Sequence, residues 1–353
     1  MEIYLAHFRN IEEKKIKFNK YPVFIVGKNG SGKTGILEAI YFLSTSKSFR
    51  SHQKNSLVNF KQNQASLELK IHPVKSSFRE ESQSDYLTGV NRKFLRISLN
   101  KTGDNQYFVN NEITPRYKFI NQILTEVFWW GDFKMVYGGP EERRRFLNLF
   151  CLQIEPVYLQ YLSLYKKIIK ERKFALLKNN LNLLEIWDKK LAVMAEKIYI
   201  VREKALKLIN LKLDKILDSI RPKFDHPSVK YKGKFLSRHD FLIKLKHSRP
   251  KDLLDFKTHF GPHRDDLKFT WRKIDLKNFS QGEVKSYVLG MKLNFLLNLP
   301  QKEKYFLIDD VFAEIDEVVI MNLLKLATKK KIKLILTQQD LPKVNLAGQL
   351  VKL

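Results

Sequence analysis

Hydrophobic positions near the N-terminus alternate with polar ones and then change to a helical spacing. Three short runs, EIYLAHF, KIKF and YPVFIVG, have the composition of β-strands, and the third is apolar until it stops at Gly27. From Thr34 onward the apolar residues recur every three or four positions, as on one face of a helix. The pattern therefore predicts a strand, a glycine-containing loop and a helix in direct succession.

The rest of the chain shows two further patterns. Strand-like alternation returns between about 66 and 113, interrupted by the polar stretch SSFREESQSD, for which we expect a loop. Helical spacing dominates from Pro156 to about Ile220, with one break at 177–182. Two long antiparallel helices joined at that break would form a hairpin, which we interpret as plain helix packing without chemistry of its own. Strand-like runs then resume in LKFTW, KYFLIDDVF and KIKLILTQ.

These patterns predict an α/β fold in which a β-rich head is split in sequence by a helical insertion. The insertion would be a helical lobe or a short hairpin arm. The predicted boundaries place the two parts of the head at 1–150 and 256–353 and the helical insertion at 151–255.

Composition adds a candidate partner. Lys and Arg number 65 against 37 Asp and Glu, a net charge of +28 that suits a polyanion, with nucleic acid the leading candidate. The alternative is a Lys-rich composition that only keeps the protein soluble, and charge alone does not decide between them. The single cysteine, Cys151, lies in an apolar run and is expected in the core, so an intrachain disulfide is excluded. Without a signal-peptide pattern or about 18 uninterrupted apolar residues, we expect a cytoplasmic protein with no membrane partner.

A phosphate-binding motif follows the third strand. GKNGSGKT at 27–34 satisfies the pattern G-x-x-x-x-G-K-[ST], between an apolar strand and a helix as the motif requires. Its glycines allow backbone N–H groups to turn toward phosphates, Lys33 would reach the β- and γ-phosphates, and the Thr34 hydroxyl would bind Mg²⁺. We therefore predict that ATP binds with Mg²⁺ through Gly27, Lys28, Asn29, Gly30, Ser31, Gly32, Lys33 and Thr34.

An acidic pair ends a later strand. In YFLIDDVFAEID at 305–316 we assign Asp309 to the metal and Asp310 to activation of the attacking water, with Lys33 as the second catalytic residue. Neighbouring residues on a strand point to opposite sides, so both acids can serve only if the strand ends there and the chain turns. The alternative is a pair of aspartates that merely caps a turn.

A serine and a glycine precede an amphipathic run in FSQGEVKSYVLGMKL at 279–293. Ser280 taken alone is more often an N-cap than a ligand of nucleotide. Its position about 25 residues before the acidic strand makes Ser280 and Gly282 candidates for nucleotide binding.

The order of these motifs resembles the ABC-type ATPase head of the SMC and Rad50 class, and within that class the RecF family. The resemblance spans nearly the whole chain, in family order. It rests on HFRN at 7–10, GKNGSGKTGILEAIYFLSTSKSFR at 27–50, GGPEERRRFLNLF at 138–150, PVYLQYLSLYKK at 156–167, GPHRDDL at 261–267, FSQGE at 279–283 and LIDDVFAEID at 307–316.

The resemblance implies a site shared by two copies of the chain. One protomer would hold ATP in the loop, and Ser280 and Gly282 of a second copy would close on the γ-phosphate, so that ATP joins a homodimer. Hydrolysis, a weak ATPase activity, would reopen it. Family members act in DNA replication and recombinational repair, including the SOS response; they bind gapped or single/double-strand junction DNA without sequence preference and work with RecR and RecO to load recombinase.

Some positions depart from the family pattern. Gly35, Glu283 and Lys285 are unusual, as are WWGDF at 129–133 and TQQD at 337–340. These departures concern hydrolysis and its coupling to closure more than nucleotide binding.

Basic residues of the shared motifs are candidates for DNA contact or for structural roles. Arg50, Arg143, Arg144 and Arg145 could each touch DNA, and each could equally be a solvated charge or part of an internal interface. His263 and Arg264 fit a turn-capping role at least as well as a catalytic one.

Two other functions compete with an ATP-gated DNA-binding protein. A P-loop nuclease or nucleotide kinase would need further clustered carboxylates, and no residual segment is large enough for such a domain. A scaffold that binds ATP and barely hydrolyses it is the second alternative.

Overall fold

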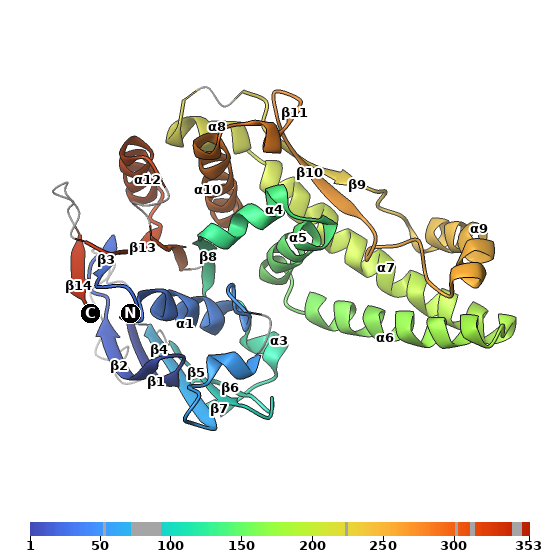
Figure 1. Cartoon of the computed structure of the whole chain (residues 1–353), viewed down its shortest axis with the longest axis horizontal. Coiled ribbons are helices and arrows are strands. Elements are labelled where there is room, and N and C mark those ends of the chain that lie inside the picture. Colours follow the sequence, from blue (N-terminus) through green and yellow to red (C-terminus); the bar gives the residue numbers. More distant parts are fainter. Residues whose placement is uncertain (52–53, 72–92, 223–224, 301–302, 311–314, 341–347) are drawn as a thin grey trace, which may run out of the picture. The chain divides into compact units, whose positions relative to one another are not determined.

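The computed structural model describes the whole chain except residues 52–53, 72–92, 223–224, 301–302, 311–314 and 341–347 (Figure 1). The predicted polar loop at 76–85 and the first half of AEID lie outside the described residues. The described chain forms two compact units, one of residues 1–130 and 301–353 and one of residues 131–300.

The first unit contains a parallel sheet that carries the phosphate loop. Every residue of the strand before the loop is buried, as the unbroken apolar run predicts. Helix α12 (Glu317–Lys329) joins two strands of this sheet. The strand order is β14 (Gln349–Lys352), β3 (Val23–Val26), β13 (Lys333–Gln338), β12 (Lys304–Ile308) and β8 (Leu124–Phe128).

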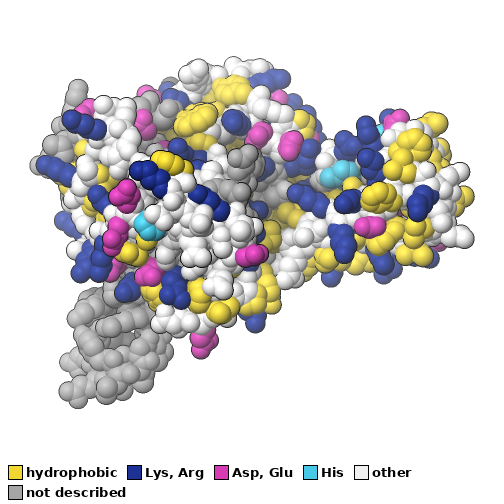
Figure 2. All heavy atoms as spheres, turned by 60° about the horizontal axis from the view of Figure 1, so that its bottom comes forward, with side chains coloured by type: hydrophobic (Ala, Val, Ile, Leu, Met, Phe, Trp, Pro, Cys, Tyr) yellow, Lys and Arg dark blue, Asp and Glu magenta, His cyan; other side chains and the backbone are white. Residues whose placement is uncertain are grey.

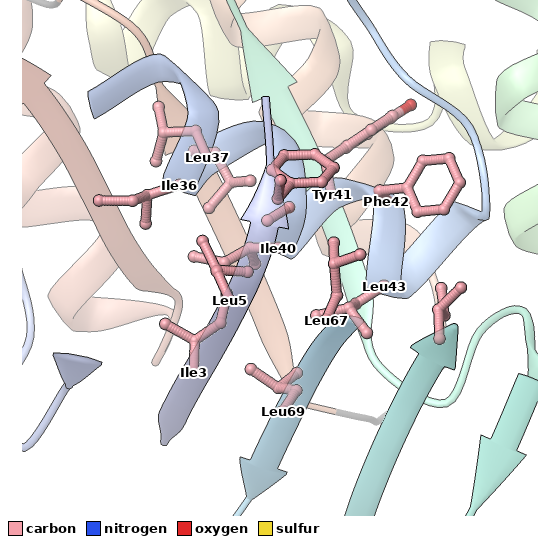
Figure 3. Close-up of a cluster of buried hydrophobic side chains, with 14 of the residues drawn as sticks. Ile3, Leu5, Ile36, Leu37, Ile40, Tyr41, Phe42, Leu43, Leu67 and Leu69 are labelled. Atoms are coloured by element: carbon pink, nitrogen blue, oxygen red, sulfur yellow. The ribbon is translucent and has the colours of Figure 1, made fainter. Parts of the chain in front are cut away.

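An antiparallel sheet forms the second layer of this unit, and helix α1 (Lys33–Thr45) packs between the two sheets. Ile36, Leu37 and Ile40 of α1 meet Leu5 and Leu67 of the antiparallel sheet in one buried cluster (Figure 3). The strand order is β2 (Ile11–Lys17), β1 (Glu2–Phe8), β4 (Gln64–Ile71), β5 (Lys93–Asn100), β6 (Gln106–Val109) and β7 (Glu112–Ile113), with the short helices η1 (Lys54–Leu57) and α3 (Arg116–Phe119) beside it.

The second unit is mainly helical. Helices α6 and α7 pack along each other and are joined by a short turn inside the predicted break at 177–182. A small sheet, in the order β11, β10, β9, packs on α5 and α7. After η2 (Trp130–Phe133), which spans the boundary, the elements are α4 (Lys134–Tyr137), α5 (Pro140–Ile154), α6 (Tyr158–Leu177), α7 (Leu181–Asn210), α8 (Leu213–Ile220), β9 (Ser228–Lys232), α9 (Arg238–Asp255), β10 (Asp266–Trp271), β11 (Ile274–Asp275), η3 (Leu276–Asn278) and α10 (Gln281–Asn298).

The compact units divide the chain after Trp130 and after Pro300, whereas the sequence pattern placed boundaries after 150 and 255. The difference has a packing reason. Helix α5 packs on α7, and β10 pairs with β9, so GGPEERRRFLNLF and LKFTW belong with the helices of the second unit. Cys151 is fully buried on α5, as its apolar neighbours indicate. In the described parts of the chain, no helix is long and apolar enough to cross a membrane.

Candidate nucleotide-binding site

The loop after β3 has the backbone of a phosphate cradle. Gly30 and Gly32 have φ angles of +84° and +96°, a left-handed conformation that side chains rarely adopt. A Cβ atom at Gly32 would also lie 3.2 Å from the Ile11 side chain, which would have to shift to admit it. Helix α1 starts directly afterwards, at Lys33, and its N-terminal N–H groups face the loop.

The Lys33 side chain folds back over this loop. Its ammonium donates hydrogen bonds to the backbone carbonyls of Gly27, at 2.5 Å, and Lys28, at 3.0 Å. From the neighbouring sheet, Asn10 Nδ2 donates to the Gly30 carbonyl at 2.8 Å. The loop is therefore braced from two sides, and the ammonium lies where it can exchange carbonyl oxygens for phosphate oxygens.

Asp309 lies against the start of α1, as a shared metal site requires. The Thr34 hydroxyl donates to both carboxylate oxygens, at 2.9 and 3.1 Å, and the Thr337 hydroxyl donates to Oδ1 at 2.7 Å. Burial raises the pKa of Asp309, while the hydroxyls of Thr337 and Thr34 oppose that shift. A buried carboxylate beside two hydroxyls is a set of hard oxygen ligands that suits Mg²⁺.

Protein groups alone are too few for a complete cation site. Among the described residues there is no cluster of three or more His, Cys, Asp or Glu side chains able to hold a metal. Thr34 and Asp309 would supply two ligands, and the remaining positions suit water and phosphate oxygens, which is the usual way proteins bind Mg²⁺ with nucleotides.

The chain turns sharply after Asp309. Strand β12 ends at Ile308, Asp310 has a φ angle of +52°, and its N–H donates to the Thr337 hydroxyl at 2.9 Å. Asp310 is exposed while Asp309 is 8% exposed. The condition set by the sequence, that the strand must end for both acids to face one site, is met.

Most of these groups line one cavity of about 880 Å³ in the first unit, whereas Gly27, Lys28 and Ser31 of the phosphate loop are not among its lining residues. Lys33 and Asp309 both line this cavity. Three further basic side chains, from Arg9, Arg50 and Lys101, line it as well, so four cations face the two acids Asp309 and Asp310. Its other lining residues are Asn10, Asn29, Gly30, Gly32, Thr34, Gly35, Ser56, Val58, Phe60, Trp130, Asp310 and Thr337.

Both arginines of the cavity, Arg9 and Arg50, approach the buried carboxylate of Glu38. Glu38 of α1 is fully buried and accepts a bidentate pair of hydrogen bonds from Arg9, at 2.6 and 3.0 Å. Arg50, 43% exposed, lies 3.6 Å from the same carboxylate. Arg50, which the sequence made a candidate for DNA contact, therefore borders the nucleotide cavity. Arg9, Glu38 and Thr337 were not singled out from the sequence, although Arg9 lies in the HFRN motif.

Ser280 lies in the other compact unit and caps a helix. Its hydroxyl accepts from the Glu283 N–H, and the Glu283 carboxylate accepts from the Ser280 N–H at 3.0 Å, which together form a capping box at the start of α10. The bond with Ser280 lowers the pKa of Glu283. The Gly282 carbonyl accepts from Ser286 at 2.8 Å. The structure thus explains the departure at Glu283 as a helix cap and leaves Ser280 exposed at the helix end.

The arginines of GGPEERRRFLNLF differ in their contacts. Arg143 makes bidentate hydrogen bonds to Asp266, at 2.6 and 3.0 Å, and Arg144 donates to the Asp265 carbonyl at 2.9 Å. Arg145 is 3.9 Å from Glu142. Two of the three arginines therefore join α5 to GPHRDDL, as the alternative of an internal interface predicts.

His263 and Arg264 brace a turn. Burial lowers the pKa of His263 to about 4, so the ring is neutral at pH 7. We assign its Nε2 as the donor to the Thr258 carbonyl at 3.0 Å, which leaves Nδ1 to accept from the Tyr165 hydroxyl at 2.8 Å. Arg264 Nε also donates to the Thr258 carbonyl, at 3.3 Å. These contacts favour the turn-capping role over a catalytic one.

Comparison with known proteins agrees with this geometry. The family model described as RecF/RecN/SMC N terminal domain matches residues 1–353. DNA replication and repair protein RecF of Leptospira interrogans (serovar Lai) is 33% identical over 319 residues, covering 88% of this chain and 84% of that protein. RecF of Streptococcus agalactiae (serotype Ia) is 30% identical over 351 residues, covering 96% and 91%.

Solved structures show the same fold. A structure of the recombination mediator protein RecF-ATP in the RecFOR pathway superposes with a TM-score of 0.83 at 26% identity, covering 98% of this chain and 92% of that one. The Smc head domain of Pyrococcus furiosus has a TM-score of 0.51 at 16% identity, covering 96% and 89%, which shows likeness of fold alone. The chain therefore belongs to the RecF family of DNA replication and repair proteins, within the ABC-type ATPases of the RecF, RecN and SMC class.

Proposed function

We propose that this chain binds ATP with Mg²⁺ in the cavity of the first unit and uses it as a conformational switch. Residues 27–34 would hold the phosphates, with Lys33 on the β- and γ-phosphates and Thr34 and Asp309 on the metal. The observation that carries the proposal is the set of hydrogen bonds from Thr34 and Thr337 to Asp309 in the cavity that Lys33 lines. A relative solved with ATP supports the choice of nucleotide.

The switch would be closure of a homodimer. Ser280 and Gly282 of one copy would contact the γ-phosphate held by the other, so ATP binding stabilises the closed state. The exposed position of Ser280 at a helix N-terminus supports this role, because helix N-termini attract phosphate. On closure its hydroxyl would exchange Glu283 Oε2, to which it donates at 2.7 Å, for a phosphate oxygen. Asp310 would orient the attacking water, and slow hydrolysis would reopen the dimer.

The closed dimer would bind DNA. The net charge of +28 supports contact with phosphates, which release counterions when Lys and Arg neutralise them. Figure 2 shows Lys and Arg side chains spread over the visible face and not gathered in one spot. Such a surface favours sequence-independent contact with DNA phosphates, and we propose gapped or single/double-strand junction DNA as the ligand. We propose RecR and RecO as partners in loading recombinase, supported by the RecFOR pathway of the solved relative.

The test is steady-state ATPase activity with and without gapped DNA, for wild type and Asp310→Asn. We expect weak turnover that gapped DNA stimulates and that the variant loses, since Asn cannot take up the proton of the attacking water. Turnover near zero in all samples, with ATP still bound, would favour the scaffold that barely hydrolyses. Turnover that the variant retains would contradict the role of Asp310.

A further inference from the structure

The nucleotide cavity has a second end, built from the antiparallel sheet. In that sheet, Ala6 of β1 pairs with Ser66 of β4, and Gln64 of β4 pairs with Asn100 of β5. This register brings the end of β1, the start of β4 and the end of β5 to one edge. Residues Arg9, Asn10, Phe60 and Lys101 follow or precede those strand ends, and all four line the cavity.

Phe60 is presented to solvent on a turn that is fixed. Its side chain is 82% exposed, more than any other large hydrophobic side chain of the described residues. The turn around it is nonetheless held by hydrogen bonds from the Asn59 N–H to the His7 carbonyl at 2.8 Å and from the Lys101 ammonium to the Phe60 carbonyl at 2.9 Å. The exposure is therefore a property of a braced backbone and does not come from a loose loop.

An exposed aromatic ring in the wall of a polar cavity suits a flat apolar ligand. The ring contacts the Lys61 ammonium, 5.7 Å from its centroid, which leaves most of its surface open. Nucleobases stack on aromatic side chains, and this stacking tolerates any base because every base has a π-face. When phosphates occupy the loop, the rest of a nucleotide needs such a surface within the same cavity.

The second exposed aromatic of the cavity lies at a different place. Trp130, 58% exposed, follows β8, which pairs with β12, the strand that directly precedes Asp309. The Asp309 N–H donates to the Phe128 carbonyl at 2.9 Å, so the chain just before Trp130 borders the acids. Trp130 therefore belongs to the phosphate and metal end, and Phe60 is the aromatic of the antiparallel-sheet end.

We propose that Phe60 is the platform on which the base of the bound nucleotide stacks, and that Lys101 positions it through the Phe60 carbonyl. The inference rests on the proposed nucleotide site and adds the residue that distinguishes a nucleotide from a bare polyphosphate. It implies weak discrimination among bases, because stacking alone reads none of their edges.

The test is isothermal titration of the full chain with Mg-ATP, Mg-GTP and Mg-tripolyphosphate, which has the phosphates and no base. In Phe60→Ala we expect ATP and GTP each to bind about 10-fold more weakly, as loss of one stacking contact predicts, and tripolyphosphate to bind as in wild type. Phe60→Trp should restore the nucleotide affinities. Phe60→Leu keeps apolar bulk on the turn without the ring and should behave like Phe60→Ala.

The outcomes separate this inference from the proposed function. Phe174 of α6, 48% exposed and outside the cavity, gives the control Phe174→Ala, for which all three affinities should be unchanged. Equal weakening of ATP and tripolyphosphate in Phe60→Ala and Phe60→Leu, or unchanged ATP binding in both, would overturn the role of Phe60. A wild-type chain that binds neither ligand would overturn the nucleotide site itself, and the inference with it.

Discussion

The Thr34 hydroxyl donates to both oxygens of Asp309, although 275 residues separate the two in the sequence. The contact joins the first turn of α1 to the end of β12, two strands away from the phosphate loop in the parallel sheet. Parallel strands bring such distant segments together at their carboxyl ends, where α/β sheets bind ligands. A cation placed between these two side chains would replace the hydrogen bonds that now join them.

We expect Thr34→Ala and Asp309→Asn to remove the effect of Mg²⁺ on ATP binding. Each variant loses one metal ligand, so affinity for Mg-ATP should fall about 10-fold or more, toward the affinity that wild type shows with excess EDTA. Thr34→Ser keeps the hydroxyl and should bind as wild type. Titration of each variant with ATP in Mg²⁺ and in EDTA checks this, and a magnesium effect that survives Asp309→Asn would remove Asp309 from the metal site.

The same carboxylate should lower the stability of the chain without ligand. Burial raises the pKa of Asp309, which means that the folded state favours the protonated acid over the ionised one present at pH 7. Asp309→Asn carries no charge, so its ligand-free melting temperature should equal or exceed that of wild type. A clear drop in melting temperature would mean that the ionised carboxylate stabilises the fold.

The substitutions Arg143→Ala and Arg145→Ala should affect the stability of the fold differently, although only one residue separates the two positions. Arg143 is 16% exposed and bidentate to Asp266, so Arg143→Ala should cost about 2 kcal/mol of unfolding free energy. Asp266→Ala in the same background should add little, because the pair is already broken. Denaturant unfolding of the two single variants and the double variant measures this, and additive losses would contradict the pairing.

For Arg145, 29% exposed, we expect an effect on DNA binding and almost none on stability. Arg145→Ala should leave stability within about 0.5 kcal/mol of wild type and reduce the salt dependence of gapped-DNA binding by about one ion. Equal salt slopes for wild type and Arg145→Ala would remove Arg145 from the DNA contacts.

Stability should fall in mildly acidic solution because of His263. Burial lowers the pKa of His263 to about 4, below its ordinary value of 6.5, so the unfolded chain binds a proton at a higher pH than the folded chain does. The contribution of His263 is therefore complete above pH 6.5 and is lost as pH falls from 6.5 to about 4. Thermal unfolding at pH 7.5 and pH 5 should show a smaller loss in His263→Gln than in wild type, whereas His247→Gln, at an exposed position on α9, should keep the full loss.

The local elements that the sequence predicted are those with unambiguous spacing. The run YPVFIVG, the loop at 27–34 and the helix after it could be predicted because a motif with fixed glycines leaves one arrangement of the backbone. The hairpin of α6 and α7 followed from helical periodicity with one break. The compact units could not be located in this way, because LKFTW reads as a strand equally well in either unit. Its partner β9 (SVKYK) alternates, but it lies within 151–255, the range assigned to the helical insertion.

The candidate site was predictable only where a residue type carries its own chemistry. Lys33 and Asp309 were found because a lysine after glycines and an acid at a strand end have few other uses. Thr337 was missed as a partner of Asp309, since a threonine in a strand is ordinary and only the pairing of β12 with β13 brings it there. Likewise, Arg143 and Arg144 resemble DNA contacts in sequence, and their structural role appears only with Asp265 and Asp266 opposite them.

Sedimentation of Asp310→Asn, with and without Mg-ATP and gapped DNA, tests the shared nucleotide site most directly. The variant should hold ATP without hydrolysing it, so the account predicts a monomer without nucleotide, a dimer with Mg-ATP, and a dimer that carries DNA when DNA is added. Ser280→Arg in the same background should stay monomeric while still binding ATP. A mass that stays monomeric in every condition, although ATP is bound, would contradict the shared site.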